Sequence, residues 1–231
     1  LIIHQKMNSL FILVLLSSAF LGESAPLIAN DAPPLQVLFV NDFTLNFVHE
    51  DEAMLAAKSV KCPANAYPEA AEQFAFTSAV VDAIDASIDL TLQYDFYRGG
   101  YGNLLNGHRF TRDDFAAAAG QVFRDFCFEG PAQSDLKTYV HNELYHANDV
   151  DVLVLFTAAP ASELAAALPL DADEFKAVIV IGLNGADAAA FYPTSSASIA
   201  DFNNPEVIAG MISAANADIQ QRQSALARVK S

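Results

Sequence analysis

The stretch VLFVNDFTLN, residues 37–46, places three oxygen-bearing side chains at alternate positions behind an apolar run. Asp42, Thr44 and Asn46 supply a carboxylate, a hydroxyl and an amide oxygen. Alternate side chains of an extended segment point the same way, so the three oxygens are expected to face one space. Hard oxygen donors of this kind bind Mg²⁺ or Ca²⁺. The same residue types also cap backbone groups in turns, and the sequence leaves both interpretations open.

Other motifs with recognisable chemistry are missing or have the wrong spacing. In HNELYH, His141 and His146 are five residues apart, whereas a zinc-binding helix needs its histidines four apart. No G-x-S-x-G nucleophile elbow occurs, and GLNGAD lacks both the dinucleotide-loop spacing and the P-loop lysine. Cys127 lies among phenylalanines, an apolar setting that disfavours a reactive thiolate. We therefore expect a protein that is not an enzyme.

The elements that would position these residues alternate between apolar strands and amphipathic helices. The runs at 36–40, 151–156 and 177–183 are almost wholly apolar, which is typical of strands covered on both faces. Helices are predicted at 71–84, from 111, from 134, within 161–168 and from 204. This order predicts an α/β domain with a doubly wound, mostly parallel sheet and helices on both faces.

Residues 88–97 show a different pattern, because apolar and polar residues alternate along them. Such alternation predicts a strand with one buried and one wet face. We expect this strand to be antiparallel or near an edge of the sheet, and to end in a tight turn at 98–102.

Residues 1–25 are predicted to be a leader and a secretory signal peptide, because the apolar run LFILVLLSSAFLG is followed by small residues before Ala25. The alternative is a membrane anchor, but this run is too short to cross roughly 30 Å of hydrocarbon as a helix. Residues 26–231 are then expected to form one secreted, extracellular domain.

The charge and the cysteines limit the partners and the compartment. With 28 acidic and 12 basic residues the net charge is −16, which repels nucleic acid and anionic membranes, so neither nucleic acid nor membrane insertion is expected. In a secreted chain the pair Cys62 and Cys127 predicts one disulfide bond. Two buried unpaired thiols are the alternative.

The order of the elements and VLFVNDFTLN together resemble the von Willebrand factor type A family. Asp42-x-Thr44-x-Asn46 is similar to the D-x-S-x-S motif of that family, and 88–97 stands where its second strand precedes an antiparallel edge strand. Residues 130–160 are similar to the run from its G-G-T loop through a helix into the fourth strand. The resemblance covers residues 36–220. It implies a Rossmann-like fold with a metal-ion-dependent adhesion site.

The chain departs from that family at the metal site. Residues 130–134 read GPAQS, without the threonine of the family, and Ala158 stands where the family has an aspartate. These departures imply a degenerate site with no resident cofactor, or weak binding of Mg²⁺ or Ca²⁺ by Asp42, Thr44 and Asn46. The candidate binding residues are Asp42, Thr44, Asn46, Ser134 and Thr157.

The expected function is that of a secreted, non-enzymatic binding or adhesion module that recognises an extracellular protein or matrix component. Many secreted members of the family that this chain resembles act in adhesion, matrix or immune recognition. One alternative is a secreted α/β hydrolase or transferase whose catalytic carboxylates the motifs do not identify. Another is a carrier of a small ligand built on the same sheet. Turnover of generic ester, glycoside or peptide substrates separates the enzyme from a binding module.

Overall fold

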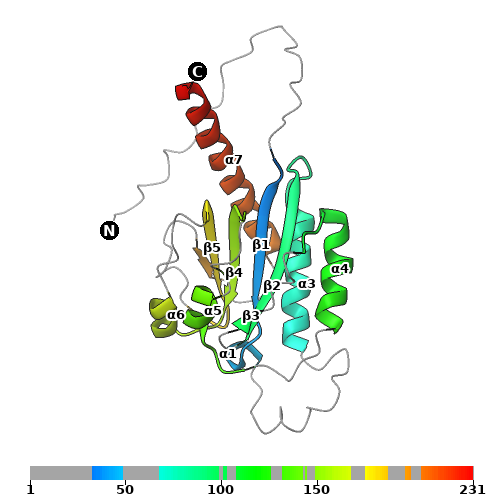
Figure 1. The fold of residues 1–231 in the computed structure, drawn as a ribbon. Helices are drawn as coiled ribbons and strands as arrows, with labels where there is room; N and C mark the ends of the chain where they lie inside the picture. The colour runs from blue at the N-terminus through cyan, green and yellow to red at the C-terminus, as the bar shows by residue number, and fades with distance from the viewer. Residues whose placement is uncertain are drawn as a thin grey trace, which may run out of the picture. The chain divides into compact units, whose positions relative to one another are not determined.

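One sheet of six strands lies at the centre of the described part of the chain, with helices on both of its faces (Figure 1). The computed structural model describes residues 33–48, 68–98, 101–102, 108–125, 132–142, 144, 149–167, 175–186, 196–198 and 204–230. The strands are β1 (Leu35–Asp42), β2 (Leu90–Arg98), β3 (Tyr101–Gly102), β4 (Val152–Thr157), β5 (Ala177–Gly182) and β6 (Ser196–Ser198). The helices are α1 (Leu45–Val48), α3 (Pro68–Ala83), α4 (Arg112–Asp125), α5 (Leu136–Asn142), α6 (Ala161–Ala167) and α7 (Pro205–Lys230).

The strand β1 lies inside this sheet and pairs in parallel with β2 on one side and with β4 on the other. The strand order is β3-β2-β1-β4-β5-β6, and β4, β5 and β6 also run parallel to one another. At one edge, β3 pairs antiparallel with the end of β2. This is the strand order of a Rossmann-like sheet. The predicted α/β fold with a doubly wound, mostly parallel sheet is confirmed.

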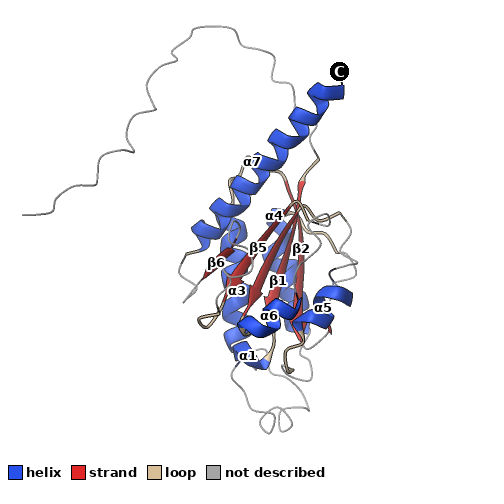
Figure 2. Ribbon diagram, turned by 90° about the vertical axis from the view of Figure 1, so that its left-hand side faces the viewer, coloured by secondary structure: helices blue, strands red, loops and turns tan. Residues whose placement is uncertain are grey.

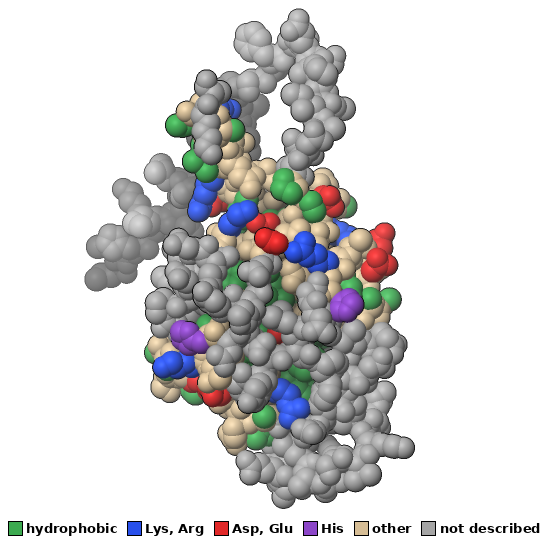
Figure 3. Space-filling view, in the orientation of Figure 1, with side chains coloured by type: hydrophobic (Ala, Val, Ile, Leu, Met, Phe, Trp, Pro, Cys, Tyr) green, Lys and Arg blue, Asp and Glu red, His purple; other side chains and the backbone are tan. Residues whose placement is uncertain are grey.

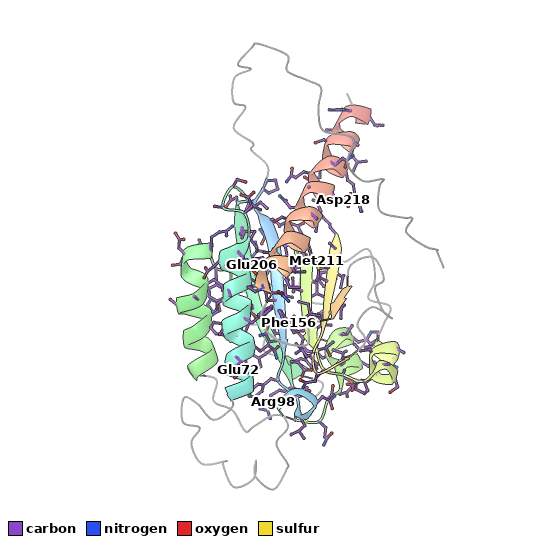
Figure 4. The ribbon with its side chains drawn as sticks, turned by 180° about the vertical axis from the view of Figure 1, so that it is seen from behind. Glu72, Arg98, Phe156, Glu206, Met211 and Asp218 are labelled. Atoms are coloured by element: carbon purple, nitrogen blue, oxygen red, sulfur yellow. The ribbon has the colours of Figure 1, made fainter. Side chains whose placement is uncertain are left out.

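Each face of the sheet has its own apolar core. The helices α3, α4 and α7 cover the face on which Phe39 of β1 is buried, and α5 and α6 cover the face of Leu38. Neighbouring residues of a strand point to opposite faces, so an apolar strand such as β1 requires a layer of helices on each side. Figure 2 shows these layers, and Figure 4 shows the first face with Phe156 and Met211 labelled.

The prediction of one wet face for residues 88–97 holds only at the start of this stretch, where Asp89 is exposed and Thr91 is partly exposed. It is wrong further along β2, because Gln93 and Asp95 are only 5% and 0% exposed. The helix α5 covers this face. There the Tyr139 hydroxyl donates a hydrogen bond of 2.7 Å to Asp95 Oδ2, and the Tyr139 ring stacks on that of Tyr97. The strand is parallel to β1, and it lies next to the edge strand β3. The sequence around Asp95 does not reveal that the Tyr139 hydroxyl, 44 residues away, will pair with it.

The other predicted elements are found close to their expected positions. The helix α4 begins after Thr111, as predicted. The Thr111 hydroxyl donates a hydrogen bond of 2.8 Å to Asp114 Oδ2 and accepts one from the Asp114 N–H, an acidic variant of the capping box. The helix α7 begins at Pro205 directly after Asn204, also as predicted. The short strand β6 was not predicted, because Ser196–Ser198 has no apolar run.

Several predictions fall on residues outside the described ranges. They are the leader and signal peptide at 1–25, the disulfide between Cys62 and Cys127, and a helix that the stretch EDEAMLAAKSV, residues 50–60, predicts. Among the residues that the structure describes, none of the helices combines the length and the apolar character needed to cross a bilayer.

The Arg112 guanidinium ties the first turn of α4 to the end of α3. Its Nη1 donates hydrogen bonds to the carbonyls of Val81 (2.9 Å) and Ile84 (2.6 Å), and its Nη2 donates to those of Asp85 (3.0 Å) and Ile88 (3.5 Å). The last carbonyls of a helix have no partners within the helix, and a cation also complements the dipole there. Arg112 therefore fixes the turn that leads from α3 into β2.

Replacing Arg112 with methionine keeps much of the aliphatic stem but removes every one of these donors. We expect Arg112→Met to lower the free energy of unfolding by about 2 kcal/mol, measured by urea denaturation. The matched control is Arg109→Met, because Arg109 pairs with Asp149 at 3.4 Å while the two side chains are 48% and 78% exposed. That change is expected to cost less than about 0.5 kcal/mol. Equal losses in the two variants would contradict the capping role of Arg112.

Candidate functional site

The candidate site lies at the C-terminal edge of the parallel strands, where Asp42 ends β1 and Thr157 ends β4. The two strands are neighbours in the sheet, so residues far apart in the sequence meet at this edge (Figure 1). In open α/β sheets this edge is where ligands bind. Asp42, Thr44 and Thr157 are nevertheless almost completely buried, with exposed fractions of 1%, 0% and 0%.

The Asp42 carboxylate accepts four hydrogen bonds from the protein itself. Oδ1 accepts from the Thr44 N–H (3.0 Å) and from the Thr44 hydroxyl (2.6 Å). Oδ2 accepts from the Tyr97 hydroxyl (2.8 Å) and from the Ala158 N–H (2.7 Å). Both Thr44 donors serve Asp42, and together they cap the turn after β1.

A chain of hydrogen bonds continues from Asp42 into the loop after β4. The hydroxyls of Tyr97 and Thr157 lie 2.9 Å apart, and since Tyr97 donates to Asp42, the Thr157 hydroxyl is the donor here. Thr157 Oγ1 in turn accepts from the Ala159 N–H at 3.1 Å. Thr157, predicted as a binding residue, therefore belongs to the same buried network as Asp42.

Burial controls the ionisation of both groups at the centre of this network. Loss of hydration raises the pKa of the Asp42 carboxyl above its usual value, while the hydrogen bonds from Ala158, Thr44 and Tyr97 act in the opposite direction. Burial, and next the charge of Asp42, raise the pKa of the Tyr97 hydroxyl well above its usual value. Tyr97 therefore remains a neutral donor to Asp42.

The backbone of Asp42 is held from the opposite face of the sheet by α3. Gln73 Oε1 accepts from the Asp42 N–H at 2.7 Å, and Gln73 Nε2 donates to the Asp42 carbonyl at 3.1 Å. One helical turn later, the Thr77 hydroxyl lies 3.1 Å from both side-chain polar atoms of Asn41. Sequence reasoning missed Gln73 and Thr77. Their signal was two polar residues at a spacing of four beside the apolar stripe of this helix.

The loop before α5 also reaches the site, as the resemblance implied. Thr44 forms a parallel bridge with Ala132, and the Leu45 N–H donates a hydrogen bond of 3.0 Å to the Ala132 carbonyl. Ser134 has another partner, because its hydroxyl donates to Glu163 Oε1 of α6. Glu163 also accepts from the Leu136 N–H at 2.8 Å, so this glutamate caps the start of α5 and Ser134 holds it there.

Asn46 is separated from the other predicted ligands by a change in backbone geometry. The premise that residues 42, 44 and 46 share one extended segment fails at Leu45, where α1 begins. The Asn46 carbonyl accepts a hydrogen bond of 3.4 Å from Asn184 Nδ2, which links α1 to the turn after β5. Asn184 and Gly185 adopt positive φ angles of 50° and 80°, and the Ala186 N–H closes this turn on the Leu183 carbonyl.

The polar groups of this site already form hydrogen bonds with one another. Nowhere in the described ranges do three His, Cys, Asp or Glu side chains come together as ligands for a metal. The Asp42 carboxylate holds three segments together through its hydrogen bonds: the β1–α1 turn, the strand β2 and the loop after β4.

No protein-family model matches this sequence, and no curated protein sequence matches it. In structure, the chain is similar to von Willebrand factor type A from Catenulispora acidiphila, at 11% identity over 80% of this chain and 43% of that one, with a TM-score of 0.49. It is also similar to the conserved hypothetical protein BatB from Bacteroides thetaiotaomicron, at 12% identity over 79% of this chain and 98% of that one, with a TM-score of 0.48.

A third similar structure is proximal thread matrix protein 1 from the mussel byssus, at 12% identity over 78% of this chain and 47% of that one, with a TM-score of 0.45. This chain thus spans less than half of two of the three. The structure from Catenulispora acidiphila is of the family that the sequence resembles. At identities of 11–12% the similarity of all three structures concerns the fold alone.

The raised pKa of Asp42 gives the site a defined dependence on pH. A carboxyl whose pKa is higher in the folded than in the unfolded chain stabilises the fold below its unfolded pKa, and this contribution is lost as the pH rises through the folded pKa. The protonated form fits the network, because the hydroxyls of Thr44 and Tyr97 can each turn and accept the proton. An asparagine amide leaves a backbone N–H of Thr44 or Ala158 without its acceptor.

We expect Asp42→Asn to lower the free energy of unfolding by about 1–3 kcal/mol at acidic pH, where the raised pKa of the carboxyl favours the folded wild-type protein, and by less at neutral pH. Urea denaturation of both proteins across this range measures the difference. The control is Thr77→Val, which removes hydrogen bonds to Asn41 and the Gln73 carbonyl but has no titrating group, so its loss should not vary with pH. A loss for Asp42→Asn that grows toward neutral pH contradicts the raised pKa.

Proposed function

We propose that this chain is a secreted, non-enzymatic binding module whose partner is an extracellular protein or matrix component. The observation that carries the proposal is the full use of the Asp42 carboxylate by four internal donors. A general base or nucleophile must reach its substrate, and this carboxylate is 1% exposed. In this proposal the Asp42 carboxylate fixes the positions of the loops that contact the partner.

The partner is proposed to bind at the C-terminal edge of the sheet, on what we call the strand-end surface. Exposed residues of three separate loops form it: Gln133 before α5, Pro160 after β4 and Asn184 after β5. Loops positioned by a rigid sheet are where α/β proteins bind their ligands. The resemblance to the von Willebrand factor type A family, many of whose secreted members bind other proteins, supports the same location.

Secretion and the disulfide remain predictions from the sequence. Both rest on residues outside the described ranges: the segment 1–25, Cys62 and Cys127. The intact mass of the natural protein, isolated without reductant, tests both, since leader removal and disulfide formation each change it by a known amount.

We also propose that the site has lost the metal of the family that the chain resembles. Both Asp42 oxygens already accept two hydrogen bonds each, and the second carboxylate of the family is replaced by Ala158, whose N–H occupies Asp42 Oδ2. Ala132 stands at the loop position that pairs with Thr44, and Asn46 lies in α1. An ion that bound here would have to displace the hydrogen-bond donors of Asp42. It would also lose tightly held water and gain only one carboxylate ligand in return.

Calorimetry with Mg²⁺ and with Ca²⁺ tests this part of the proposal. We expect millimolar affinity or none for the wild-type protein, because one carboxylate with neutral oxygens offsets little of the cost of dehydrating the ion. The double variant Ala132→Thr with Ala158→Asp adds a hydroxyl and a carboxylate at the two loops nearest Thr44 and Asp42. It should bind the ion more tightly than either single variant. Micromolar binding by the wild-type protein contradicts the proposal.

The location of the binding surface is tested by capture from the extracellular fluid in which the protein occurs. Gln133→Arg places a long cation on the strand-end surface beside Ala132, and we expect it to weaken capture of the partner about tenfold or more. Ala83→Arg also introduces a long cation, at an exposed position at the end of α3 near the opposite edge of the sheet, and should leave capture unchanged. Equal capture by both variants contradicts the location, and turnover of generic ester, glycoside or peptide substrates contradicts the non-enzymatic role.

A further inference from the structure

The turn after β5 carries an asparagine followed by a glycine, Asn184-Gly185, in the stretch GLNGAD that lacks the spacing of a nucleotide-binding loop. Both residues are exposed. Their φ angles are 50° and 80°, and a backbone hydrogen bond of 2.9 Å from the Ala186 N–H to the Leu183 carbonyl closes the turn. A short exposed turn of this kind opens locally far more often than the core of a protein does.

An asparagine that precedes a glycine can react with its own backbone. The backbone nitrogen of the glycine loses its proton to hydroxide and attacks the asparagine Cγ. The new N–C bond closes a succinimide ring, and the side-chain nitrogen leaves as ammonia. Water then adds to either ring carbonyl and opens the ring, which leaves an aspartate or an isoaspartate. Nothing is oxidised or reduced, and glycine is the most favourable second residue because it has no Cβ to hinder the attack.

The surroundings of Asn184 favour this reaction. The space that a side chain would occupy at Gly185 is open, because no heavy atom of the described structure beyond the chain neighbours lies within 4 Å of it. The Asn184 side-chain amide donates to the Asn46 carbonyl at 3.4 Å, which is long for a hydrogen bond, so this contact holds the amide only weakly. Exposure lets hydroxide and water reach the turn and lets ammonia leave.

We propose that Asn184 is a site of spontaneous deamidation in the folded protein, and that its conversion loosens the attachment of α1 to the turn after β5. An ionised aspartate has only acceptor oxygens, so it cannot donate to the Asn46 carbonyl and repels it instead. Isoaspartate also lengthens the backbone by one carbon, which disturbs the hydrogen bond that closes the turn.

The effect of the new carboxylate is expected to be local. Figure 3 shows acidic and basic side chains interspersed over the described part of one face, and charges exposed to solvent are screened over about 10 Å. The immediate contact with Asn46 therefore decides what deamidation changes. Asn184 belongs to the strand-end surface, so this surface changes in charge and shape as the protein ages. The reaction requires no partner, and it stands or falls separately from the proposed function.

Incubation of the folded protein at neutral and mildly alkaline pH, followed by peptide mapping with mass spectrometry, tests the reaction. We expect the Asn184 amide to be lost faster as the pH rises, because hydroxide removes the proton of the Gly185 N–H. The loss should be about tenfold slower than in the free peptide GLNGAD, because the turn must open before the nitrogen can reach Cγ. Mapping also separates this site from the other Asn-Gly pair of the sequence, at residues 106–107.

An internal control lies at the start of α7. Asn204 is also exposed, but it precedes Pro205, whose nitrogen has no hydrogen and cannot close the ring, so its amide should remain. An Asn184 amide that stays intact in the folded protein long after the peptide is fully converted overturns the proposal. Loss of that amide only after unfolding in urea overturns it equally.

The loosening of α1 has its own measurement. The Leu45 N–H at the start of α1 donates to the Ala132 carbonyl at 3.0 Å, and its hydrogen exchange, followed by NMR, reports how firmly α1 is held. We expect Asn184→Asp to raise this exchange rate about threefold at the same pH. Asn204→Asp adds the same charge at the start of α7 and should leave the rate unchanged. An unchanged rate in Asn184→Asp overturns the effect on α1.

Discussion

A buried carboxylate that must keep its hydrogen-bond donors determines the C-terminal edge of this sheet. Taking the charge of Asp42 out of water costs several kcal/mol unless other donors replace the water. The four donors come from the β1–α1 turn, from β2 and from the loop after β4. None of these three segments can move without leaving the carboxylate or a buried donor unsatisfied. The strand-end surface is therefore rigid at its base, whatever its outer residues bind.

The same requirement operates on both faces of the sheet. On each face a helix supplies a polar side chain that pairs with a strand: Gln73 of α3 holds the backbone of Asp42 on one face, and Tyr139 of α5 holds Asp95 on the other. Buried polar groups without partners are costly, so each pair fixes the position of one helix along one strand. Apolar contacts alone would allow a helix layer to shift slightly along the sheet. These hydrogen-bonded pairs oppose such a shift, because it would leave buried polar groups without partners.

The sequence predicted best what depends on local patterns and least what depends on distant partners. The apolar runs of β1, β4 and β5 required cover on both faces, and the caps at Thr111 and Asn204 marked where helices begin. The alternation in β2 was misread, because the partner of Asp95 lies 44 residues away in α5. Asn46 was grouped with Asp42 because periodicity cannot show that a short helix begins between them. The positions of the loops at Ala132 and Ala158 were predicted correctly only because of the family resemblance, since no local pattern shows that they lie near Asp42.

The central position of β1 has a consequence for how the chain acquires its structure during synthesis. Its neighbour β4 follows much later in the sequence: the Gln36 N–H bonds to Asp151 across 115 residues, and Asp42 meets the Ala158 N–H across 116. Contacts of such separation form slowly, because the loop between them must close first. While the ribosome makes the middle of the chain, β1 can pair with β2 but has an open second edge. An apolar strand with an open edge is prone to wrong pairing between chains, so this period is the most hazardous in the production of the protein.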